Sequence, residues 1–368
     1  MSDLRLIYKL KQHTPMIHFQ SDQIGATLRA TELKPKLDKF LLMNIKELPF
    51  VKHANGAKSL DYKVSIRAIG VVIKDIETFD NRGREQKDPL FFGNMGDGVR
   101  KKFVESGNIE IEFVTFNAQI KNAIENLFEG FLAQTNFGTR QSKGFGSFYL
   151  DKPFDKSLIP HKVYSFKSSN WKNDIKLFYS FLRQGINLPN SEGTRFYSKP
   201  AIFAYALSKN ITWDKKAIKQ HFFSDILNTQ QAKYAQNSPV NFSGQNSFLM
   251  RDLFGLSSSQ SWLSYRATVE KEHQEIERFK SPITFKIIAG TVYFWADKSI
   301  EKILNKTFTI STKGNKPLSL STPKEFDFDD FFNMAFAIDL TKHIDPKFHS
   351  QNEFSTLTRI FNDIKASK

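Results

Sequence analysis

Apolar and polar side chains alternate in three stretches of the first 150 residues, which is the pattern of strands with one buried face. These stretches lie at residues 4–10, 62–72 and 109–113, and residues 145–150 offer a fourth strand. Apolar residues at helical spacing predict two helices, over 33–41 and 120–132, and Asn117 is placed to cap the second. The order β-α-β-β-α-β predicts a ferredoxin-like (RRM-like) α+β domain over residues 1–152. Its sheet has one face free of helices, and RRM-type proteins lay RNA across that face.

The second half repeats parts of this pattern after a junction at residues 151–156. We expect a strand at 163–167, a helix at 175–182, a strand at 201–207, a helix at 213–227, a hairpin at 283–295 around Gly290, and C-terminal helices up to 364. This predicts a second, degraded ferredoxin-like domain over 160–368. Residues 74–107 of the first domain form a polar, basic insertion, and the Gln-, Asn- and Ser-rich residues 229–262 form an insertion in the second.

Composition supports a folded chain with an acidic partner. The 368 residues suit two domains, and 40% hydrophobic with 25% charged residues is normal for globular proteins. Lys and Arg exceed Asp and Glu by 53 to 38, so the net charge is +15. Such an excess favours binding to a polyanion.

The sequence lacks the residues that several classes of function need. The chain has no cysteine, and its eight histidines show neither helical i,i+4 pairs nor zinc spacings, so we expect no metal site and no cofactor. No run of apolar residues is long enough to span a bilayer. We therefore expect a cytoplasmic protein without a membrane partner.

The segment Gly138-Thr-Arg-Gln-Ser-Lys-Gly-Phe-Gly-Ser147 is the sharpest local motif. Its glycines allow close approach of another chain, and Arg140 and Lys143 supply charge for a phosphate backbone. The candidate contacts within it are Arg140, Lys143, Gly144, Phe145, Gly146 and Ser147. It is neither a Walker A loop nor a dinucleotide fingerprint. The alternative is a helix-to-strand turn that needs glycine for its backbone alone.

Basic residues at three other places are candidates for RNA contact. Arg29, Lys34 and Lys36 surround the start of the first helix, whose free N–H groups favour anions. Arg82, Arg84, Arg100 and Lys101 lie in the basic insertion, and Arg278 and Lys280 precede a late strand. Solvated surface charge is the alternative at the first two places, and a structural turn is the alternative at Arg278 and Lys280.

Catalysis has one weak candidate. His18 follows the first strand, and a lone histidine can act as general base on a ribose hydroxyl in metal-independent RNA cleavage. The alternative is a structural, hydrogen-bonded histidine.

Together these motifs resemble the RAMP superfamily of CRISPR-associated ribonucleoprotein subunits, in which a Gly-rich loop follows the second helix of a ferredoxin-like domain. Lys143 to Ser147 match that loop. Thr14-Pro15, the stretch Leu28 to Thr31 and the strand entry Arg278 to Pro282 are most similar to the subunit that caps the guide 3′ end in type III-B (Cmr) effector complexes.

The resemblance implies an RNA-binding subunit for antiviral defence without nuclease activity. Its expected partners are guide or target RNA, backbone RAMP subunits and a small helical subunit. Two alternatives remain open: a metal-independent endoribonuclease that processes CRISPR RNA with His18 as base, and a protein scaffold that binds no RNA.

Overall fold

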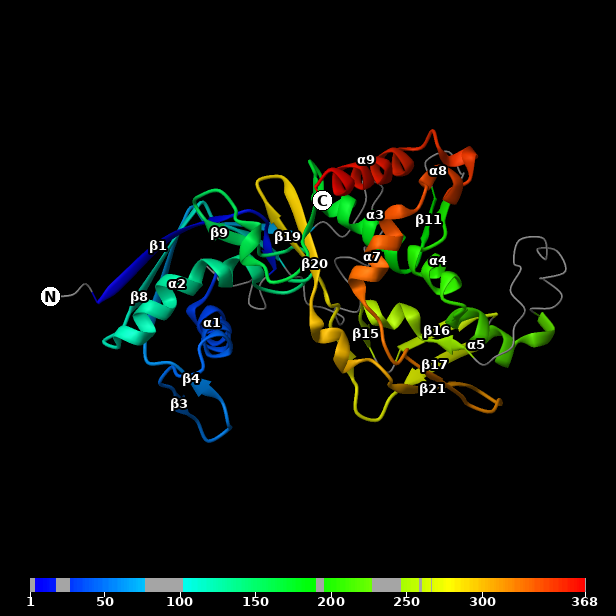
Figure 1. Ribbon diagram of the computed structural model, residues 1–368, viewed down its shortest axis with the longest axis horizontal. Helices are drawn as coiled ribbons and strands as arrows, with labels where there is room; N and C mark the ends of the chain where they lie inside the picture. The colour runs from blue at the N-terminus through cyan, green and yellow to red at the C-terminus, as the bar shows by residue number, and fades with distance from the viewer. Residues whose placement is uncertain are drawn as a thin grey trace. The chain divides into compact units, whose positions relative to one another are not determined.

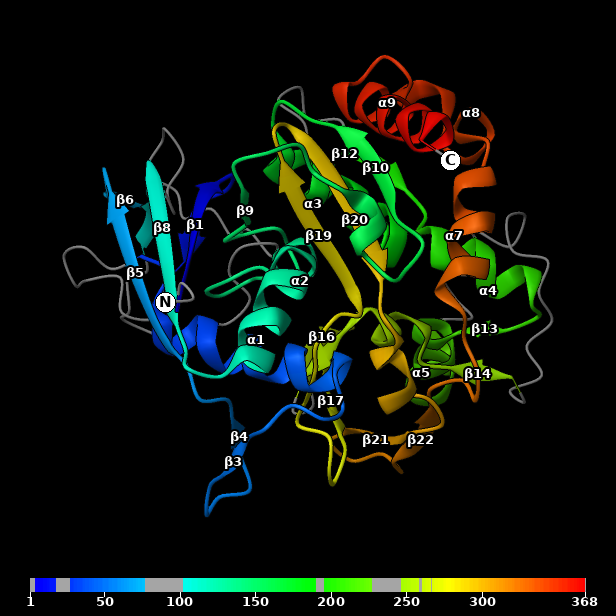
Figure 2. The same cartoon turned by 60° about the vertical axis from the view of Figure 1, so that its left-hand side comes forward.

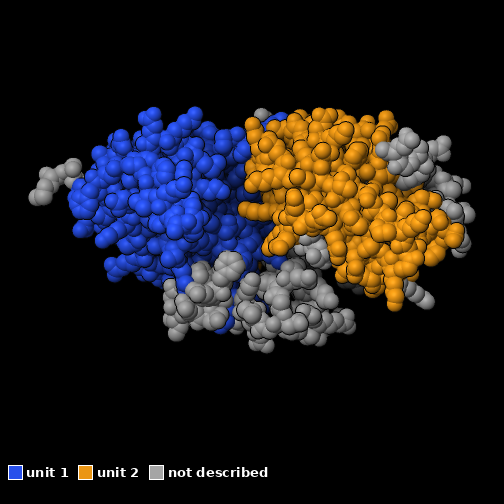
Figure 3. Space-filling view, turned by 90° about the horizontal axis from the view of Figure 1, so that it is seen from below, with its two compact units in different colours: residues 1–171, 284–295 blue, residues 172–283, 296–368 orange. Residues whose placement is uncertain are grey.

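The computed structural model describes residues 4–17, 27–76, 102–189, 195–226, 246–257, 260–265 and 267–367. The chain divides into two compact units, shown separately coloured in Figure 3. The first contains residues 1–171 and 284–295, and the second contains residues 172–283 and 296–368. Residues 284–295 belong to the first unit, whereas the sequence predicted one contiguous second domain over 160–368.

The first unit contains a four-stranded antiparallel sheet. Its strands are β1 (Arg5–Gln12), β5 (Lys63–Ile69), β8 (Asn108–Val114) and β9 (Phe148–Leu150), in the order β5-β8-β1-β9. Side chains along β8 alternate between buried and exposed, because Ile109, Ile111 and Phe113 face the core. The four strands expected in the first 150 residues are confirmed in this sheet.

Helices α1 (Ala30–Asn44) and α2 (Ala118–Gln134) lie on the same side of this sheet (Figures 1 and 2). Their apolar faces complete a core in which the Phe128 ring contacts both Phe113 and Tyr8. The Asn117 side chain accepts hydrogen bonds from the N–H groups of Gln119 and Ile120, so the expected cap of α2 is confirmed.

Smaller elements extend the first unit. The strands β2 (Met16–Ile17), β7 (Lys102–Glu105) and β6 (Val72–Asp75) form a three-stranded sheet, and β3 (Val51–Lys52) pairs with β4 (Lys58–Ser59). The ends of the predicted insertion 74–107 are therefore the paired strands β6 and β7, while residues 77–101 lie outside the described part.

The expected hairpin around Gly290 is confirmed. Strands β19 (Ile283–Ile288) and β20 (Thr291–Ala296) form it, and β10 (Tyr164–Lys167) joins it in the order β10-β20-β19. Both Ala289 and Gly290 have positive φ at its turn.

The second unit combines helices with a six-stranded sheet of order β13-β14-β22-β21-β17-β16. Its helices are α3 (Trp171–Arg183), α4 (Ala201–Ser208), α5 (Asp214–Phe222), α7 (Phe328–Ala337), α8 (Leu340–His343) and α9 (Asn352–Ala366). Its strands are β11 (Ile186–Pro189), β12 (Arg195–Ser198), β13 (Thr212–Trp213), β14 (Ser247–Phe248), β15 (Leu256–Ser257), β16 (Gln260–Ser264), β17 (Ala267–Glu272), β18 (Arg278–Phe279), β21 (Thr307–Thr312) and β22 (Leu318–Ser321). Of the expected insertion 229–262, residues 229–245 and 258–259 lie outside the described part.

The expected strand at 201–207 is wrong, because this segment is helix α4. A short continuous apolar run fits a buried helix as well as a strand. Pro200 takes the N-cap position of α4, and three alanines within the run favour a helix. No helix among the described residues is long and apolar enough to cross a membrane.

Candidate nucleic-acid interface

The Gly-rich loop, residues 138–147, connects α2 to β9 in the first unit and has a tightly specified backbone. Gly138, Arg140, Gly144 and Gly146 all have positive φ. A Cβ on Gly146 would lie 1.9 Å from the carbonyl oxygen of Phe137, and one on Gly138 would lie 2.6 Å from that of Ile17. Glycine is therefore required at both positions by close backbone contacts as well as by φ.

The chain that follows β1 holds one side of the loop. The Thr14 hydroxyl donates to the Gly144 carbonyl at 2.7 Å and accepts from the Ser147 N–H at 2.9 Å. The Gly146 N–H donates to the carbonyl of Pro15 at 2.9 Å. The Thr14-Pro15 turn thus sets the shape of a loop that lies some 130 residues later in the chain.

Strand β19 holds the other side. Lys143 forms a parallel bridge with Phe285, and the Ser147 hydroxyl donates to the Ile287 carbonyl at 2.8 Å. The Asn136 side-chain amide donates to the Phe285 carbonyl, also at 2.8 Å. The hairpin is therefore part of the loop's support, which explains why residues 284–295 belong to the first unit.

Lys286 anchors this hairpin from within the core. It is fully buried, and its Nζ donates to the carbonyls of Leu132, Thr135 and Phe148 at 2.7, 2.8 and 2.9 Å. Burial lowers the pKa of Lys286 well below its usual value. The three acceptors match the three N–H donors of an ammonium, so these bonds favour the protonated form that burial opposes. Sequence reasoning missed Lys286, although a lone lysine within the apolar run 283–288 was a visible signal.

Most of the loop faces inward. Gly144, Phe145, Gly146 and Ser147 are buried, and the Phe145 ring stacks on Phe103 at 5.8 Å and meets Trp171 edge-on at 5.0 Å. These candidates therefore shape the loop from inside.

The two loop cations differ in accessibility. Arg140 is partly exposed. The Nζ of Lys143 is shielded from solvent and lies 6.0 Å from the centre of the Phe285 ring. Arg140 is therefore the better placed of the two to meet a ligand.

Glu32 ties the loop to the start of α1. Its carboxylate accepts from the Gly138 N–H at 2.7 Å and pairs with Lys36 at 2.7 Å. Arg29, at the N-cap position of α1 and partly exposed, lies one helical turn before Glu32. Arg140 follows Gly138 by two residues, so the loop segment that carries Arg140 is attached to the end of α1 at which Arg29 lies.

The side chains of Lys34 and Lys36 bind partners within the first unit. The ammonium of Lys34 bonds to Asp38 at 2.9 Å and to the Leu60 carbonyl at 2.8 Å, and it lies over the Tyr62 ring. Lys36 lies over the Phe137 ring in addition to its pair with Glu32. Glu32 itself places negative charge in the first turn, so α1 already carries an anion there.

The remaining candidates lie either outside the described residues or in the second unit. His18, Arg82, Arg84, Arg100 and Lys101 lie outside the described residues. Arg278 and Lys280 belong to the second unit, where both are exposed on either side of the buried Phe279.

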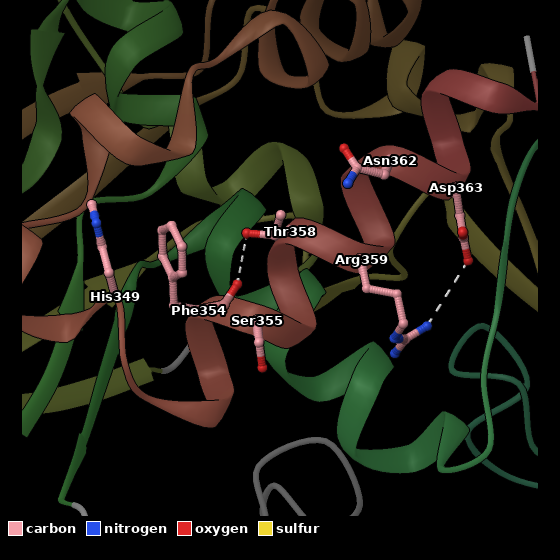
Figure 4. Close-up of a pocket in the computed structure, with 7 residues that line it drawn as sticks. All are labelled: His349, Phe354, Ser355, Thr358, Arg359, Asn362 and Asp363. Atoms are coloured by element: carbon pink, nitrogen blue, oxygen red, sulfur yellow. Dashed lines mark hydrogen bonds and ion pairs between the residues drawn. The ribbon is translucent and has the colours of Figure 1, made fainter.

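The second unit also has a shallow hollow of about 590 Å³ beside α9 (Figure 4). It contains none of the predicted site residues. Arg359, which lines it, pairs with Asp174 and lies 3.9 Å from Asp363. His349 stacks on Phe354 at 4.2 Å. Within the described ranges, no group of three His, Asp or Glu side chains could hold a metal ion.

Comparison with known proteins gives one family for both halves of the chain. The model of the Cmr1 N-terminal domain matches residues 3–186, and that of the Cmr1 C-terminal domain matches residues 197–366. No curated protein matches significantly.

Two solved structures show a distant likeness. One is apo Cmr1 from Pyrococcus furiosus, with 11% identity, a TM-score of 0.33, and coverage of 80% of this chain and 89% of that chain. The other is a type III-B Cmr-beta complex bound to cognate target RNA and AMPPnP, with 11% identity, a TM-score of 0.32, and coverage of 91% and 98%.

The family models confirm the predicted resemblance to type III-B RAMP proteins. Since one model accounts for each half of the sequence, the chain belongs to the Cmr1 family of RAMP proteins from type III-B CRISPR effector complexes.

Proposed function

We propose that the chain is an RNA-binding subunit of its effector complex that grips guide or target RNA through the phosphate backbone. The observation that carries this proposal is the hydrogen bond from the Gly138 N–H to Glu32, which ties the Gly-rich loop that carries Arg140 to the first turn of α1, where Arg29 is the N-cap residue. Guanidinium groups bind phosphate by paired hydrogen bonds, and a rigid support reduces the entropy lost on binding.

The buried part of the loop supports this role. Thr14 and β19 hold the loop on both sides, so the Arg140 backbone is placed before RNA arrives. Its φ of 58° is one that non-glycine residues seldom adopt, and strained backbones of this kind concentrate at functional sites. In this proposal Gly144 to Ser147 position Arg140, while Lys143 reinforces the local positive charge.

The fold supports the same assignment. The first unit has the βαββαβ connectivity and the strand order β5-β8-β1-β9 that a ferredoxin-like domain requires. In the second half, β10 and α3 come first and β19 and β20 follow after several intervening elements; the sheet order β10-β20-β19 supports a degraded second copy that carries insertions and lacks its fourth strand. We propose backbone RAMP subunits and a small helical subunit as protein partners, and a cytoplasmic location.

A titration of the purified protein with fluorescein-labelled single-stranded RNA tests the proposal. Fluorescence anisotropy at low and moderate salt should show tight, salt-sensitive binding. The double variant Arg29→Glu, Arg140→Glu should weaken binding at least tenfold. Lys313→Glu, an exposed lysine in the turn between β21 and β22, makes the same change of charge per residue and should have little effect.

The same samples separate the alternatives. Intact RNA on a denaturing gel agrees with a binding subunit, whereas metal-independent cleavage would assign nuclease activity and direct attention to His18. RNA affinity that is equal in the double variant and in Lys313→Glu would contradict the proposed site. Absence of RNA binding at low salt would favour the protein scaffold.

A further inference from the structure

The outer face of the four-stranded sheet, opposite α1 and α2, carries ordered columns of charge. The register places Arg67, Glu110 and Lys9 in one row across β5, β8 and β1. Lys63, Val114 and Arg5 form the last row at one end. Five cations on β5 and β1 therefore flank two carboxylates on β8: Arg5, Lys9, Lys11, Lys63 and Arg67 around Glu110 and Glu112.

The positive charge on this face is accessible. The side chains of Lys9, Lys11, Lys63 and Arg67 are exposed, and in the described ranges none of them makes a side-chain hydrogen bond or ion pair. Arg5 pairs with Glu112 at 3.2 Å but remains 67% exposed. The face thus keeps an excess of positive charge after its internal pairing.

Phe116 follows the end of β8 by two residues and is 87% exposed. The residue before it is firmly held: the Thr115 N–H donates to the Leu4 carbonyl at 3.2 Å, and its hydroxyl donates to the Asp61 carbonyl at 2.8 Å. The residue after it, Asn117, caps α2. Phe116 is therefore presented from an anchored backbone just beyond the starts of β1 and β5.

The exposed ring of Phe116 contributes nothing to the core. Burial of such a ring would stabilise the fold by about 2 kcal/mol, and the fold forgoes that stabilisation here. Single-stranded nucleic acids bind where an aromatic ring stacks on a base and neighbouring cations meet the phosphates. Phe116 with Lys63 and Arg5 has these components in one place. The rest of the face extends the positive charge along β1, where Lys9 and Lys11 are separated by about 7 Å.

We propose that this end of the sheet is a second contact for single-stranded RNA. A base stacks on Phe116, the flanking phosphates meet Lys63 and Arg5, and the strand continues along β1, because Glu110 and Glu112 repel it from β8. The inference rests on the proposed RNA-binding function, yet it assigns contact to residues other than those around the Gly-rich loop.

A protein partner fits this face less well. A stable protein interface covers about 800 Å² on each side and has an apolar centre. Here the exposed apolar side chains, Ile7, Ile69 and Phe116, are separated by charged residues on every strand. Charge of one predominant sign beside a single ring is the pattern for nucleic acid.

Affinity measurements on matched variants test the inference. Phe116→Ala should lower the affinity for unstructured RNA about tenfold, because a base–aromatic stack is worth about 1–3 kcal/mol. Phe116→Tyr keeps the ring and should bind as wild type does. Leu263→Ala removes a side chain of similar exposure, 77%, from the second unit and serves as the control. Because Phe116 is exposed, the melting temperature should not change in any of these variants.

Photocrosslinking identifies the contact directly. RNA that contains 5-iodouridine should crosslink to Phe116, as mapped by mass spectrometry of the digested protein, and Lys63→Glu should reduce the yield. Unchanged affinity of Phe116→Ala with no crosslink at Phe116, while Arg29→Glu, Arg140→Glu weakens binding, would overturn this inference and leave the proposed function standing. Loss of a partner subunit from Phe116→Ala in a pull-down, with RNA affinity unchanged, would also overturn it. Wild-type RNA affinity in all of these variants would overturn both.

Discussion

The fold lowers the pKa of His13 far enough for the effect on stability to be measured. Its Nδ1 accepts a hydrogen bond from the Ala289 N–H at 3.3 Å, and burial, together with Lys286 and Lys11, lowers its pKa to about 4. The unfolded chain therefore takes up a proton near pH 6.5, before the folded chain does. The neutral ring's contribution to stability is present above pH 6.5 and is lost as the pH falls to about 4.

We predict that His13→Asn is less sensitive to acid than the wild type. Asparagine offers an oxygen acceptor near the position of Nδ1 but does not titrate. Between pH 7 and pH 4.5 the wild type should lose on the order of 1–2 kcal/mol more unfolding free energy than the variant, after allowance for the partial exposure of the ring. Thermal melts across this range measure the difference. If the two proteins lose the same unfolding free energy over this pH range, His13 does not contribute to the acid sensitivity.

Gly146 and Gly314 allow a matched test of the loop. Both have positive φ, but a Cβ on Gly146 meets the Phe137 carbonyl at 1.9 Å whereas one on Gly314 meets no atom within 4 Å. Gly314→Ala should cost about 1 kcal/mol for the backbone conformation alone. Gly146→Ala should cost at least about 3 kcal/mol, since the loop must also move. Urea denaturation measures both values, and equal costs would contradict the close packing of the loop.

At the scale of elements, the hairpin of β19 and β20 depends on Lys286. Lys286→Met removes the donor for three buried carbonyls, at the C-terminal end of α2 and on β9. An unsatisfied buried acceptor costs about 1–3 kcal/mol, so we expect a loss of about 3 kcal/mol in unfolding free energy. Lys302→Met, an exposed lysine, should change stability by less than about 0.5 kcal/mol.

Hydrogen exchange locates the effect of Lys286→Met. The amides of β9 and of the last turn of α2 should lose protection more than those of α1, because the broken bonds lie at the former. A uniform loss across the unit, or a variant as stable as the wild type, would contradict the anchoring role.

At the scale of elements, the sequence predicted a helix or strand correctly where the local pattern of residues was strong. Alternation in β1 and β8 and the cap at Asn117 depend on neighbouring residues, so their elements were predicted correctly. In contrast, the apolar run of α4 has no periodicity that distinguishes a helix from a strand, and its environment made it a helix.

For the whole molecule, the net charge of +15 predicts that RNA binding weakens as the salt concentration rises. Each phosphate contact on a single strand contributes about −0.7 to the slope of log Kobs against log salt. Arg29→Gln, Arg140→Gln should therefore make the slope shallower by about 1.4. Anisotropy titrations from low to moderate potassium chloride measure it. An unchanged slope would mean that neither arginine contacts phosphate.

The sequence by itself determined the four strands of the main sheet and the two helices of the first unit, and the family, because these depend on periodicity, caps and motifs that span few residues. It also identified the Gly-rich loop but not which of its residues face outward.

Only the tertiary structure decided that Phe145 and Ser147 are buried, that Lys34 and Lys36 are held by internal partners, and that the hairpin 284–295 joins the first unit. The Lys286 bonds link residues 138 to 154 positions apart, and Ser147 bonds across 140. Contacts at such separations leave no local pattern in the chain, so packing alone could assign these side chains to support rather than to the surface.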